Sequence, residues 1–515
     1  MNSRSEWIYT LSLTAPSLDD NTADVDRLIS AVQQKRCVKT VSMDFTLAKK
    51  LPQILRNAGY NVDCVVFNDR SESVILDVIS VENTRRVLGL AVDLGTTRVV
   101  TRLMDLYSGQ VLIESTFDNP QLSVGPDILT RIHHADTQKG EQHLHQLILD
   151  ALNRHIENIL HTCSLQADSL YAVSVAGNTT MTHLFLGLPP RHIIREPYIP
   201  VMNTPQVVRA RDLGIAANPS ARVLVFPNVG SYFGGDLIAG ILHADIHNHE
   251  KTTLLVDVGT NAEVLVGNRQ WLIACAGAAG PALEGGATQM GMLAGPGVID
   301  RVRISSKTRN IDIHTIENGP PKGICGSGLI DLAAQLFRSG MIDIRGKFVP
   351  HACGRKLVEI EQLAHLVIVP ASLSASGSNL TISQADLDSL IRSKAAMYTI
   401  LNTITRSVGV TWSDIDTFYI AGTFGAYIDP ESAITIGMIP DLPRERFVSL
   451  GNSSLEGATC ALRDNRRLDE IDAIRSQVTY LELNVNQAFM ARFSAAKFLP
   501  HTDKSRFPSV QVPDA

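Results

Sequence analysis

The sequence carries one acidic turn motif twice, once in each half of the chain. DLGTT at residues 93–97 follows the apolar run VLGLAV, and DVGTN at residues 257–261 follows TTLLV. Each motif then runs into a further β-branched and apolar stretch, which predicts a turn between two strands. A strand that ends in a carboxylate can hold Mg²⁺ directly or through water. Asp93 and Asp257 are therefore the first candidates for chemistry.

Glycine, hydroxyl and amide groups complete the chemistry of these turns. The glycine of each motif lets the backbone turn tightly and approach a phosphate without a clashing Cβ atom. The side chain that follows it, together with backbone N–H groups, can donate hydrogen bonds to phosphate oxygens. An ordinary Asp-x-Gly hairpin explains either copy alone. Two copies, with glycine-rich segments still to come, predict a duplicated ATP-binding fold.

Two further segments of small residues follow predicted strands. AAGPALEGG at residues 278–286 contains Glu284 as its only charge, which could order a metal-bound water or act as a base. An acid at a helix start is the alternative interpretation of Glu284. Residues 417–421 predict a strand that ends in GTFGA at residues 422–426. Its paired glycines suit the close passage of an adenosine moiety.

Cys325 lies in a third glycine-rich segment, GICGSG at residues 323–328. The segment opens the amphipathic stretch LIDLAAQLFRSG, which predicts a helix ended by Gly340. A glycine-flanked loop at a helix N-terminus can contact an anion or a nucleotide. A close-packed loop with an inert thiol is the alternative for the cysteine.

The seven cysteines are spread along the chain, and no two of them stand at CxxC spacing. This arrangement predicts reduced, mostly buried thiols and no iron–sulfur cluster held by this chain. His183 and Asp236 are lone titratable residues in predicted helices. His183 has a proton-carrying and a structural interpretation, and Asp236 has a functional interpretation beside a simple favourable interaction with the helix dipole.

Length and composition exclude several classes of protein. A chain of 515 residues predicts two or more domains of roughly 150 residues each. The net charge of −6 comes without a basic stripe interleaved with aromatic residues, which argues against nucleic-acid binding. The N-terminus has no apolar segment typical of a signal peptide, and no stretch reaches the ~18 uninterrupted apolar residues of a membrane span. We expect a soluble, cytoplasmic protein without a membrane partner, and Met1 favours a complete chain.

Changes in pattern along the sequence predict the domain organisation. Residues 1–87 read as a small α/β domain for docking or structure, because strand-like and helix-like runs alternate there without a catalytic constellation. Residues 88–250 and 251–480 read as the two lobes of the duplicated fold, and residues 481–515 as a C-terminal helix and tail. Residues 346–378 have poor periodicity and predict an insertion or surface excursion.

The order of four motifs resembles a known superfamily. DLGTT, VAGNTTMTHL, DVGTN and AGTFGAYID occur in this order along the chain. They resemble, in turn, the first phosphate loop, the connecting helix, the second phosphate loop and the adenosine loop of the actin, sugar-kinase and heat-shock-chaperone ATPases, the ASKHA superfamily. The resemblance implies an α/β fold made of two ribonuclease-H-like lobes around a nucleotide cleft, with ATP and Mg²⁺ as cofactors.

A longer series of strings narrows the resemblance to one family. AVDLGTT, DNPQ, GNTTMTHL, EPYIP, LLVDVGTN, AAGPALEGG, GICGSGLID, AGTFGAYID and LGNSSLEGA occur in the order typical of ATP-dependent reductive activators of corrinoid proteins. They cover residues 90–458, and the small domain before them is similar to that family's middle domain. The resemblance therefore covers most of the chain.

This resemblance implies a redox function in methyl transfer. Corrinoid methyl carriers work as Co(I), and they become inactive when they oxidise to Co(II). The activators bind the corrinoid protein and couple ATP hydrolysis to the return of Co(II) to Co(I). Family members usually carry an iron–sulfur domain, which this sequence lacks, so a separate ferredoxin-like donor is the expected source of electrons. A homodimer is an expected assembly that the sequence leaves open.

Two other functions remain open at this point. A non-redox ATP switch would remodel a corrinoid protein or methyltransferase without transferring an electron. A small-molecule kinase of the same superfamily would instead need a substrate pocket with a carboxylate base, and the sequence defines no such pocket.

The resemblance also assigns roles to residues that match its motifs. Asp93 and Asp257 are expected to organise Mg²⁺ and the attacking water, partly through water molecules, and Glu284 is the third catalytic candidate. The residues expected to contact phosphates are Gly95, Thr96, Thr97, Gly259, Thr260 and Asn261. The residues expected on the adenosine side are Gly422, Thr423 and Gly425, with Gly326 and Ser327 close to them.

Overall fold

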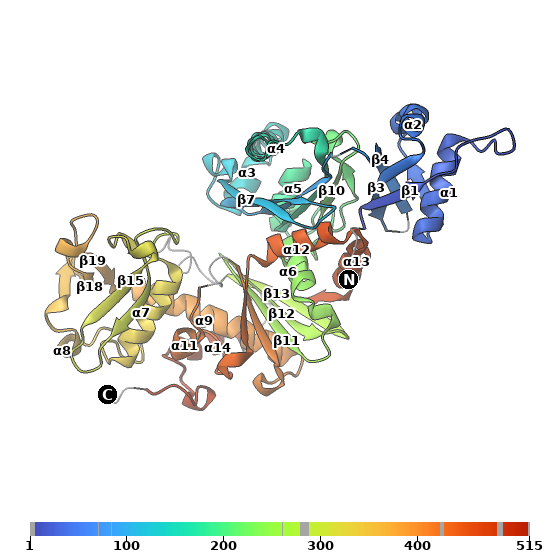
Figure 1. Ribbon diagram of the computed structural model, residues 1–515. Helices are drawn as coiled ribbons and strands as arrows, with labels where there is room; N and C mark the ends of the chain where they lie inside the picture. Colours follow the sequence, from blue (N-terminus) through green and yellow to red (C-terminus); the bar gives the residue numbers. More distant parts are fainter. Residues whose placement is uncertain are drawn as a thin grey trace. The chain divides into compact units, whose positions relative to one another are not determined.

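The computed structural model describes residues 6–70, 72–83, 85–259, 261–278, 288–422, 427–481 and 488–512 (Figure 1). The chain forms two compact units. The first combines Met1–Asp245 with Ser453–Val478, and the second combines Ile246–Asn452 with Thr479–Ala515. Among the described residues, no helix is both long and apolar enough to cross a membrane.

The first unit begins with a small four-stranded sheet in the order β1-β3-β4-β2. Its elements are β1 (Ile8–Ser12), α1 (Asp24–Arg36), β2 (Thr40–Met43), α2 (Phe45–Asn57), β3 (Asn61–Asp69) and β4 (Glu72–Ser80). Leu28 of α1 and Leu51 of α2 are fully buried against Val62 and Ile75 of the sheet. Two amphipathic helices therefore cover one mixed sheet, as the alternating pattern of the sequence predicts.

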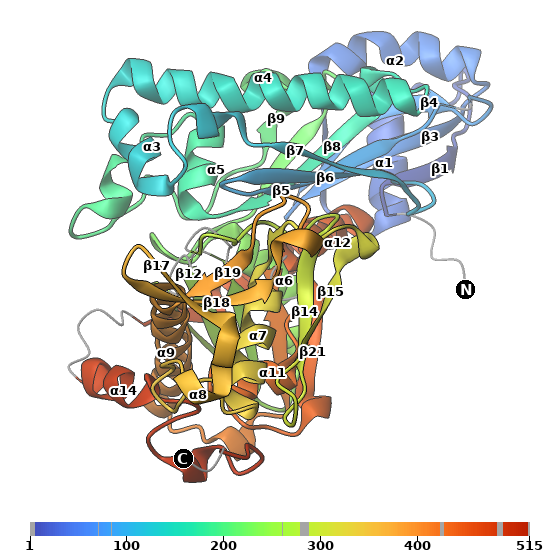
Figure 2. The ribbon, with the colours of Figure 1, turned by 90° about the vertical axis from the view of Figure 1, so that its left-hand side faces the viewer.

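A six-stranded sheet in the order β7-β6-β5-β8-β10-β9 forms the body of the first unit. Its strands are β5 (Leu88–Leu94), β6 (Arg98–Asp105), β7 (Val111–Asp118), β8 (Leu170–Gly177), β9 (Val208–Arg209) and β10 (Arg222–Val225). The helices of this body are α3 (Ile128–His134), α4 (Gln138–Thr162), α5 (Thr179–Leu186), α6 (Gly235–Ala244), α12 (Ser453–Arg463) and α13 (Leu468–Gln477). Figure 2 shows the long α4 lying along this sheet. Every residue of β8 is buried, as expected for a strand covered on both faces.

The second unit repeats this arrangement with a sheet in the order β21-β20-β11-β12-β13-β22. Its strands are β11 (Thr253–Val258), β12 (Asn261–Asn268), β13 (Trp271–Ala278), β20 (Thr417–Ala421), β21 (Phe447–Gly451) and β22 (Val478–Tyr480). β11 pairs antiparallel with β12 and parallel with β20, just as β5 pairs antiparallel with β6 and parallel with β8. The register also repeats, since Asp93 lies opposite Ala176 and Asp257 lies opposite Ala421. The predicted duplicated α/β fold is confirmed.

Further elements of the second unit form two three-stranded sheets and their helices. The strands are β14 (Val298–Ile304), β15 (Ile311–Thr315), β16 (Gly323–Ile324), β17 (Leu357–Ile360), β18 (Leu363–Val369) and β19 (Leu380–Ser383). The helices are α7 (Gly326–Arg338), α8 (Pro350–Cys353), α9 (Gln384–Ser407), α11 (Pro430–Thr435) and α14 (Ala488–Ala496). β14 pairs with β15 and β16, and β18 pairs with β17 and β19.

The expectation of a surface excursion over residues 346–378 is wrong for β17 and β18. These strands form an antiparallel hairpin, and Leu366 and Val369 are buried in the core of the second unit. The turn passes through Glu361 and Gln362, both with positive φ. Glycine or asparagine usually marks such a turn. The sequence therefore lacked the usual signal for this hairpin.

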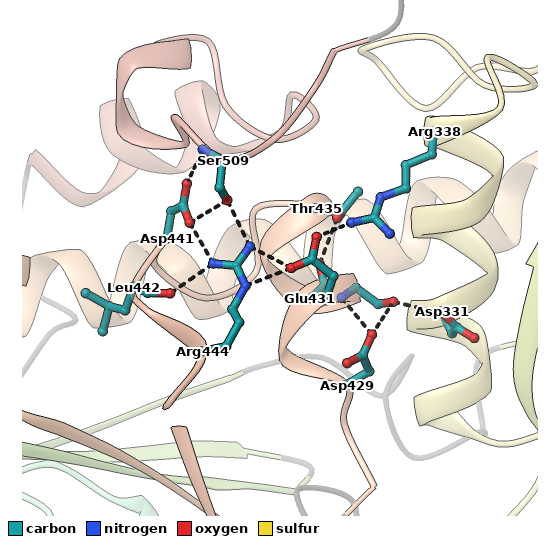
Figure 3. Close-up of polar contacts among 10 residues, drawn as sticks. Asp331, Arg338, Asp429, Glu431, Thr435, Asp441, Leu442, Arg444 and Ser509 are labelled. Atoms are coloured by element: carbon teal, nitrogen blue, oxygen red, sulfur yellow. Dashed lines mark hydrogen bonds and ion pairs between the residues drawn. The ribbon is translucent and has the colours of Figure 1, made fainter. Parts of the chain in front are cut away.

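Two polar contacts join helix α7 to the start of α11 (Figure 3). Asp331 of α7 accepts a hydrogen bond from Ser432 Oγ at 2.8 Å and one from the backbone N–H of Val302 at 2.6 Å. At the end of α7, Arg338 donates to Glu431 of α11. The helix that starts in the GICGSG segment is thus held to both a strand and a second helix.

The C-terminal segment joins the same network (Figure 3). Arg444 lies between Glu431, at 2.7 Å, and Asp441, at 2.9 Å. Ser509 donates through its hydroxyl to Asp441 at 2.7 Å and accepts from Arg444 at 2.8 Å. These contacts fasten the segment after α14 to the second unit.

Candidate functional site

Asp93 stands at the end of β5, where its carboxylate is held by a helix from far along the chain. Asp93 Oδ1 accepts a hydrogen bond from Ser454 Oγ at 2.8 Å. Ser454 lies in the first turn of α12 and is 6% exposed. Because the donor is buried and carried by a helix, it fixes the orientation of the carboxylate at the turn.

The backbone of the first turn is braced by Asn119. Its backbone N–H donates to the carbonyl of Thr97 at 2.8 Å, and its side-chain amide donates to the carbonyl of Gly95 at 2.9 Å. Asn119 is 1% exposed. A Cβ atom at position 95 would lie 2.3 Å from the carbonyl oxygen of Arg98, so the tight turn requires glycine there.

Asn178 connects the first turn to the N-terminus of α5. Its side chain caps the helix by accepting from the backbone N–H of Met181 at 3.0 Å, and it donates to Thr96 Oγ1 at 3.1 Å. The start of α6 also comes close, since a Cβ atom at Gly234 would lie 2.6 Å from Asn178 Cα and 2.6 Å from Asp236 Oδ1. The first turn therefore adjoins a capped helix N-terminus, which favours negative charge.

Asp257 occupies the matching place at the end of β11. Gly422 follows the strand β20 beside it, with φ of +89°. A Cβ atom at position 422 would lie 2.6 Å from Asp257 Oδ1. The backbone approaches the carboxylate too closely for any other residue, so glycine here leaves room beside the acid.

The structure describes only some of the predicted site residues. Thr260, Glu284, Thr423 and Gly425 lie outside the described residues. Asn261 begins β12, and its side chain is also outside the description. Gly259 lies in the described turn directly after β11. The structure thus brings Gly95, Thr96 and Thr97 together beside Asp93, and Gly259 and Gly422 beside Asp257.

Gly326 and Ser327 begin α7 in a closely packed environment. Ser327 is 6% exposed and Cys325 is 5% exposed. The Cys325 thiol lies 3.2 Å from Ser327 Oγ and 3.3 Å from the carbonyl oxygen of Ile299. A Cβ atom at Gly328 would lie 2.4 Å from the same carbonyl. This geometry favours the close-packed interpretation of Cys325.

His183 is a structural histidine in this environment. It is 2% exposed, and its Nδ1 lies 2.7 Å from the carbonyl oxygen of Thr179 one turn earlier in α5. Burial lowers the pKa of His183 below its usual value. A buried, neutral imidazole that is satisfied by its own helix is poorly placed to exchange protons with a substrate.

The sequence GNTT at residues 177–180 predicts a helix cap, whereas DNPQ at residues 118–121 carries no predicted role for Asn119. Asn119 caps a short 3₁₀ turn (Pro120–Ser123), and Asn178 caps α5. An asparagine directly before a helix start is a recognised N-cap signal. The bridges to Gly95 and Thr96 could not be read from that signal, because they depend on how distant segments pack.

The residues at the two turns fit Mg²⁺ with a polyphosphate. Mg²⁺ takes oxygen ligands, and it usually binds through one or two carboxylates together with phosphates and waters. Among the described residues, no three His, Cys, Asp or Glu side chains gather as a ready-made metal site. One carboxylate at each turn, next to glycines and hydroxyls, matches the chemistry of a magnesium–nucleotide complex rather than that of an all-protein metal cage.

Three family models match the chain in succession. The model of the RACo linker region matches residues 5–86, that of the RACo middle region matches residues 88–249, and that of the C-terminal ASKHA domain of RACo matches residues 251–511. The chain belongs to the RACo family. The ASKHA fold predicted from the motifs is confirmed. The small N-terminal domain corresponds to the RACo linker region, rather than to the middle domain that the resemblance implied.

Individual relatives agree with this membership of the RACo family. The corrinoid activation enzyme RamQ of Eubacterium limosum is 30% identical over 498 residues, which are 94% of this chain and 82% of RamQ. A Co(II) methylated amine-specific corrinoid protein reductase of Methanosarcina barkeri is 25% identical over 421 residues, which are 76% of this chain and 73% of the reductase.

A solved structure shows the same fold. The structure of a reductive activator for corrinoid, iron-sulfur protein matches with a TM-score of 0.89 and 39% identity, over 99% of this chain and 82% of that chain. The resemblance to reductive activators that the motifs predicted is therefore confirmed across nearly the whole chain.

Proposed function

We propose that this protein reductively activates a corrinoid protein and uses ATP to drive the reaction. Membership of the RACo family and the names of its relatives support the substrate class. The proposed use of ATP is supported by the repeated strand register, in which Asp93 and Asp257 end equivalent central strands beside glycine turns. Two such turns are the parts that a magnesium–triphosphate needs.

The redox step transfers one electron to the cobalt of the partner. Co(II) takes up an electron and becomes Co(I), while ATP and water become ADP and phosphate. The electron comes from a separate low-potential donor, an iron–sulfur protein of the ferredoxin class. ATP can drive the uphill transfer only if two conformations of the complex bind nucleotide with different affinity.

Residues of this chain have defined roles in the proposal. Asp93, oriented by Ser454, and Asp257, beside Gly422, organise Mg²⁺ and the attacking water, and Glu284 assists as a base. The phosphate contacts are Gly95, Thr96, Thr97, Gly259, Thr260 and Asn261. The adenosine contacts are Gly422, Thr423 and Gly425, with Gly326 and Ser327 nearby. Bound Mg²⁺ would supply charge neutralisation for the phosphates.

The proposed setting is the cytoplasm, with a homodimer as the proposed assembly. All seven cysteines are unpaired. Free thiols are typical of proteins in a reducing compartment, and disulfides are typical of oxidising ones. Sedimentation of the purified chain measures the assembly state independently of the reaction.

An anaerobic visible spectrum tests the proposed function. The corrinoid protein encoded nearest this gene is mixed with this protein, a low-potential reductant and Mg-ATP, and ATP is omitted in the control. Appearance of the Co(I) band only with ATP is the expected result. ATP hydrolysis without Co(I), even after a ferredoxin is added, would contradict reduction and favour the remodelling switch. A phosphorylated small molecule as product would instead show a kinase.

A further inference from the structure

A cavity of about 490 Å³ lies in the first unit, and its lining includes no residue of the Asp93 turn. It is open to solvent on one side and is lined by the small four-stranded sheet, the end of α1 and the segment that follows α12. Its lining residues are Glu6, Tyr9, Lys35, Arg36, Val38, Asn68, Arg70, Ser73, Asn465, Arg466, Leu468 and Asp469. The volume falls in the range of small-molecule sites, which are often found where two domains meet.

Buried amide side chains give this cavity a fixed polar floor. Asn465 is 2% exposed and Asn68 is 6% exposed. Asn465 donates to the carbonyl of Val66 at 2.9 Å and accepts from Asn68 Nδ2 at 2.6 Å. Nearby, the indole N–H of Trp7 donates to the carbonyl of Leu462 at 2.6 Å. The two walls are therefore joined before any ligand arrives, and a ligand need not organise them.

Two of the cations in the lining are already neutralised by carboxylates outside the cavity. Arg70 pairs with Asp472 at 2.5 Å, and Arg466 pairs with Asp464 at 2.9 Å. The carboxylate of Glu6 is also occupied, since it accepts from the Tyr9 hydroxyl at 2.7 Å. Glu6 also pairs with Arg466 at 3.4 Å. The remaining carboxylate of the lining is that of Asp469, which is exposed.

Lys35 and Arg36 have no carboxylate partner within the part of the chain that the structure describes. Arg36 donates to the hydroxyl of Ser73, and its guanidinium lies 5.2 Å from the centre of the Tyr9 ring. Both cations end α1, a position that is favourable through the helix dipole alone. Two cations beside a preformed polar floor nevertheless leave the cavity ready for an anion.

We propose that this cavity binds a small organic anion. Its phosphate or carboxylate group pairs with Lys35 and Arg36, and its apolar part lies against Tyr9, Val38 and Leu468. The ligand bridges the small sheet and residues 465–469, and this segment directly follows α12, whose first turn contacts Asp93. The site is independent of the proposed reaction at the carboxylate turns.

Calorimetric titration with phenyl phosphate and, separately, with benzoate tests this site. The wild-type chain should bind one equivalent, and the double variant K35Q/R36Q should bind at least about tenfold more weakly, because two charge-assisted hydrogen bonds are lost. K49Q/K50Q removes the same charge from exposed positions on α2 and should bind as the wild type does. The tighter of the two probes identifies the anionic group.

Two results would overturn the proposal. One is no binding of either probe to the wild-type chain. The other is equal binding by wild type and K35Q/R36Q, because a phosphate probe held at the nucleotide turns would not depend on Lys35 or Arg36. The single variant K35Q changes only an exposed side chain, so it keeps the test valid if the double variant unfolds. Asp257→Asn should leave this binding unchanged, which separates the site from the proposed ATPase.

Discussion

At the scale of residues, each of the two equivalent carboxylates has a close neighbour that follows from the packing of its own unit. Asp93 receives a hydrogen bond from Ser454, whereas Asp257 has the backbone of Gly422 against it. A hydrogen bond to an ionised carboxylate is stronger than one between neutral groups. A glycine contact instead sets the space around the acid. The duplicated fold thus has two turns of the same register with distinct surroundings.

Asp257→Asn should abolish ATP turnover and leave the fold intact. The amide keeps the shape of the side chain but loses the negative charge that organises Mg²⁺. Phosphate release and thermal unfolding measure the two effects. Asp312→Asn, at an exposed position on β15 of the same unit, is the matched control and should hydrolyse ATP normally. If the Asp257→Asn variant hydrolysed ATP at the wild-type rate and unfolded normally, the assigned role of Asp257 would be wrong.

Ser454→Ala should raise the Mg²⁺ concentration needed for half-maximal ATPase activity by about tenfold. The lost hydrogen bond to a charged group is worth about 1.5 kcal/mol, and without it the carboxylate of Asp93 loses a contact that orients it. Titration of activity with Mg²⁺ at saturating ATP measures the change. Ser476→Ala, at an exposed position on α13, serves as control. An unchanged Mg²⁺ dependence in Ser454→Ala would show that the contact is only structural.

The type of each turn could be predicted from the sequence, but the distant residues that contact its carboxylate could not. The acid and the glycine of each motif are local features, and they predicted the strand ends correctly. The contact between Asp93 and Ser454 joins residues 361 positions apart. No local pattern marks such a pair, since a serine at a helix start has several equally ordinary roles.

At the scale of elements, regular patterns predicted most helices and strands well. The predicted strand 417–421 coincides with β20, and the predicted helix after GICGSG appears as α7. The hairpin of β17 and β18 escaped prediction because its turn lacks glycine and its strands are short and partly exposed. Short strands contain too few residues to show a clear periodicity of apolar side chains.

Helix α9 carries a buried lysine that anchors the C-terminal segment. Lys394 is 0% exposed, and its ammonium donates to the carbonyls of Phe498 at 2.5 Å and Pro500 at 2.8 Å. Burial lowers the pKa of Lys394 well below its usual value of 10.5. A lysine in this position links the stability of the second unit to pH.

Lys394→Met should flatten the rise of stability with pH on the alkaline side. Between the lowered folded pKa and 10.5 the unfolded chain binds more protons at Lys394, so the wild-type free energy of unfolding rises with pH. The difference in slope should approach about 1.4 kcal/mol per pH unit. Urea unfolding at several pH values below 10.5 measures it, with exposed Lys497→Met as control. Parallel slopes for wild type and Lys394→Met would contradict the assigned shift.

At the scale of the whole molecule, the chain builds its first unit from two separate stretches. Ser453–Val478 joins Met1–Asp245, so the chain passes between the units after Asp245, Asn452 and Val478. Periodicity can indicate a helix, but it cannot say which sheet that helix covers. That choice depends on long-range packing, such as the close approach of Gly457 to the backbone of Ala239.

In the proposed function, nucleotide hydrolysis and electron transfer depend on each other in the whole protein. A ligand shifts a conformational equilibrium only by its difference in affinity for the two states. Each unit of this chain supplies one carboxylate turn. Because Asp93 and Asp257 are both proposed to organise Mg²⁺, loss of either carboxylate should stop the reduction of cobalt as well as the hydrolysis of ATP.

One anaerobic experiment tests this coupling most directly. Formation of Co(I) on the corrinoid partner and release of phosphate are followed together, with a low-potential reductant, for the wild-type chain and for Asp257→Asn. We expect Co(I) and phosphate to appear together in the wild type with Mg-ATP, and neither to appear in Asp257→Asn. Formation of Co(I) at the same rate without ATP, or by Asp257→Asn, would contradict this coupling.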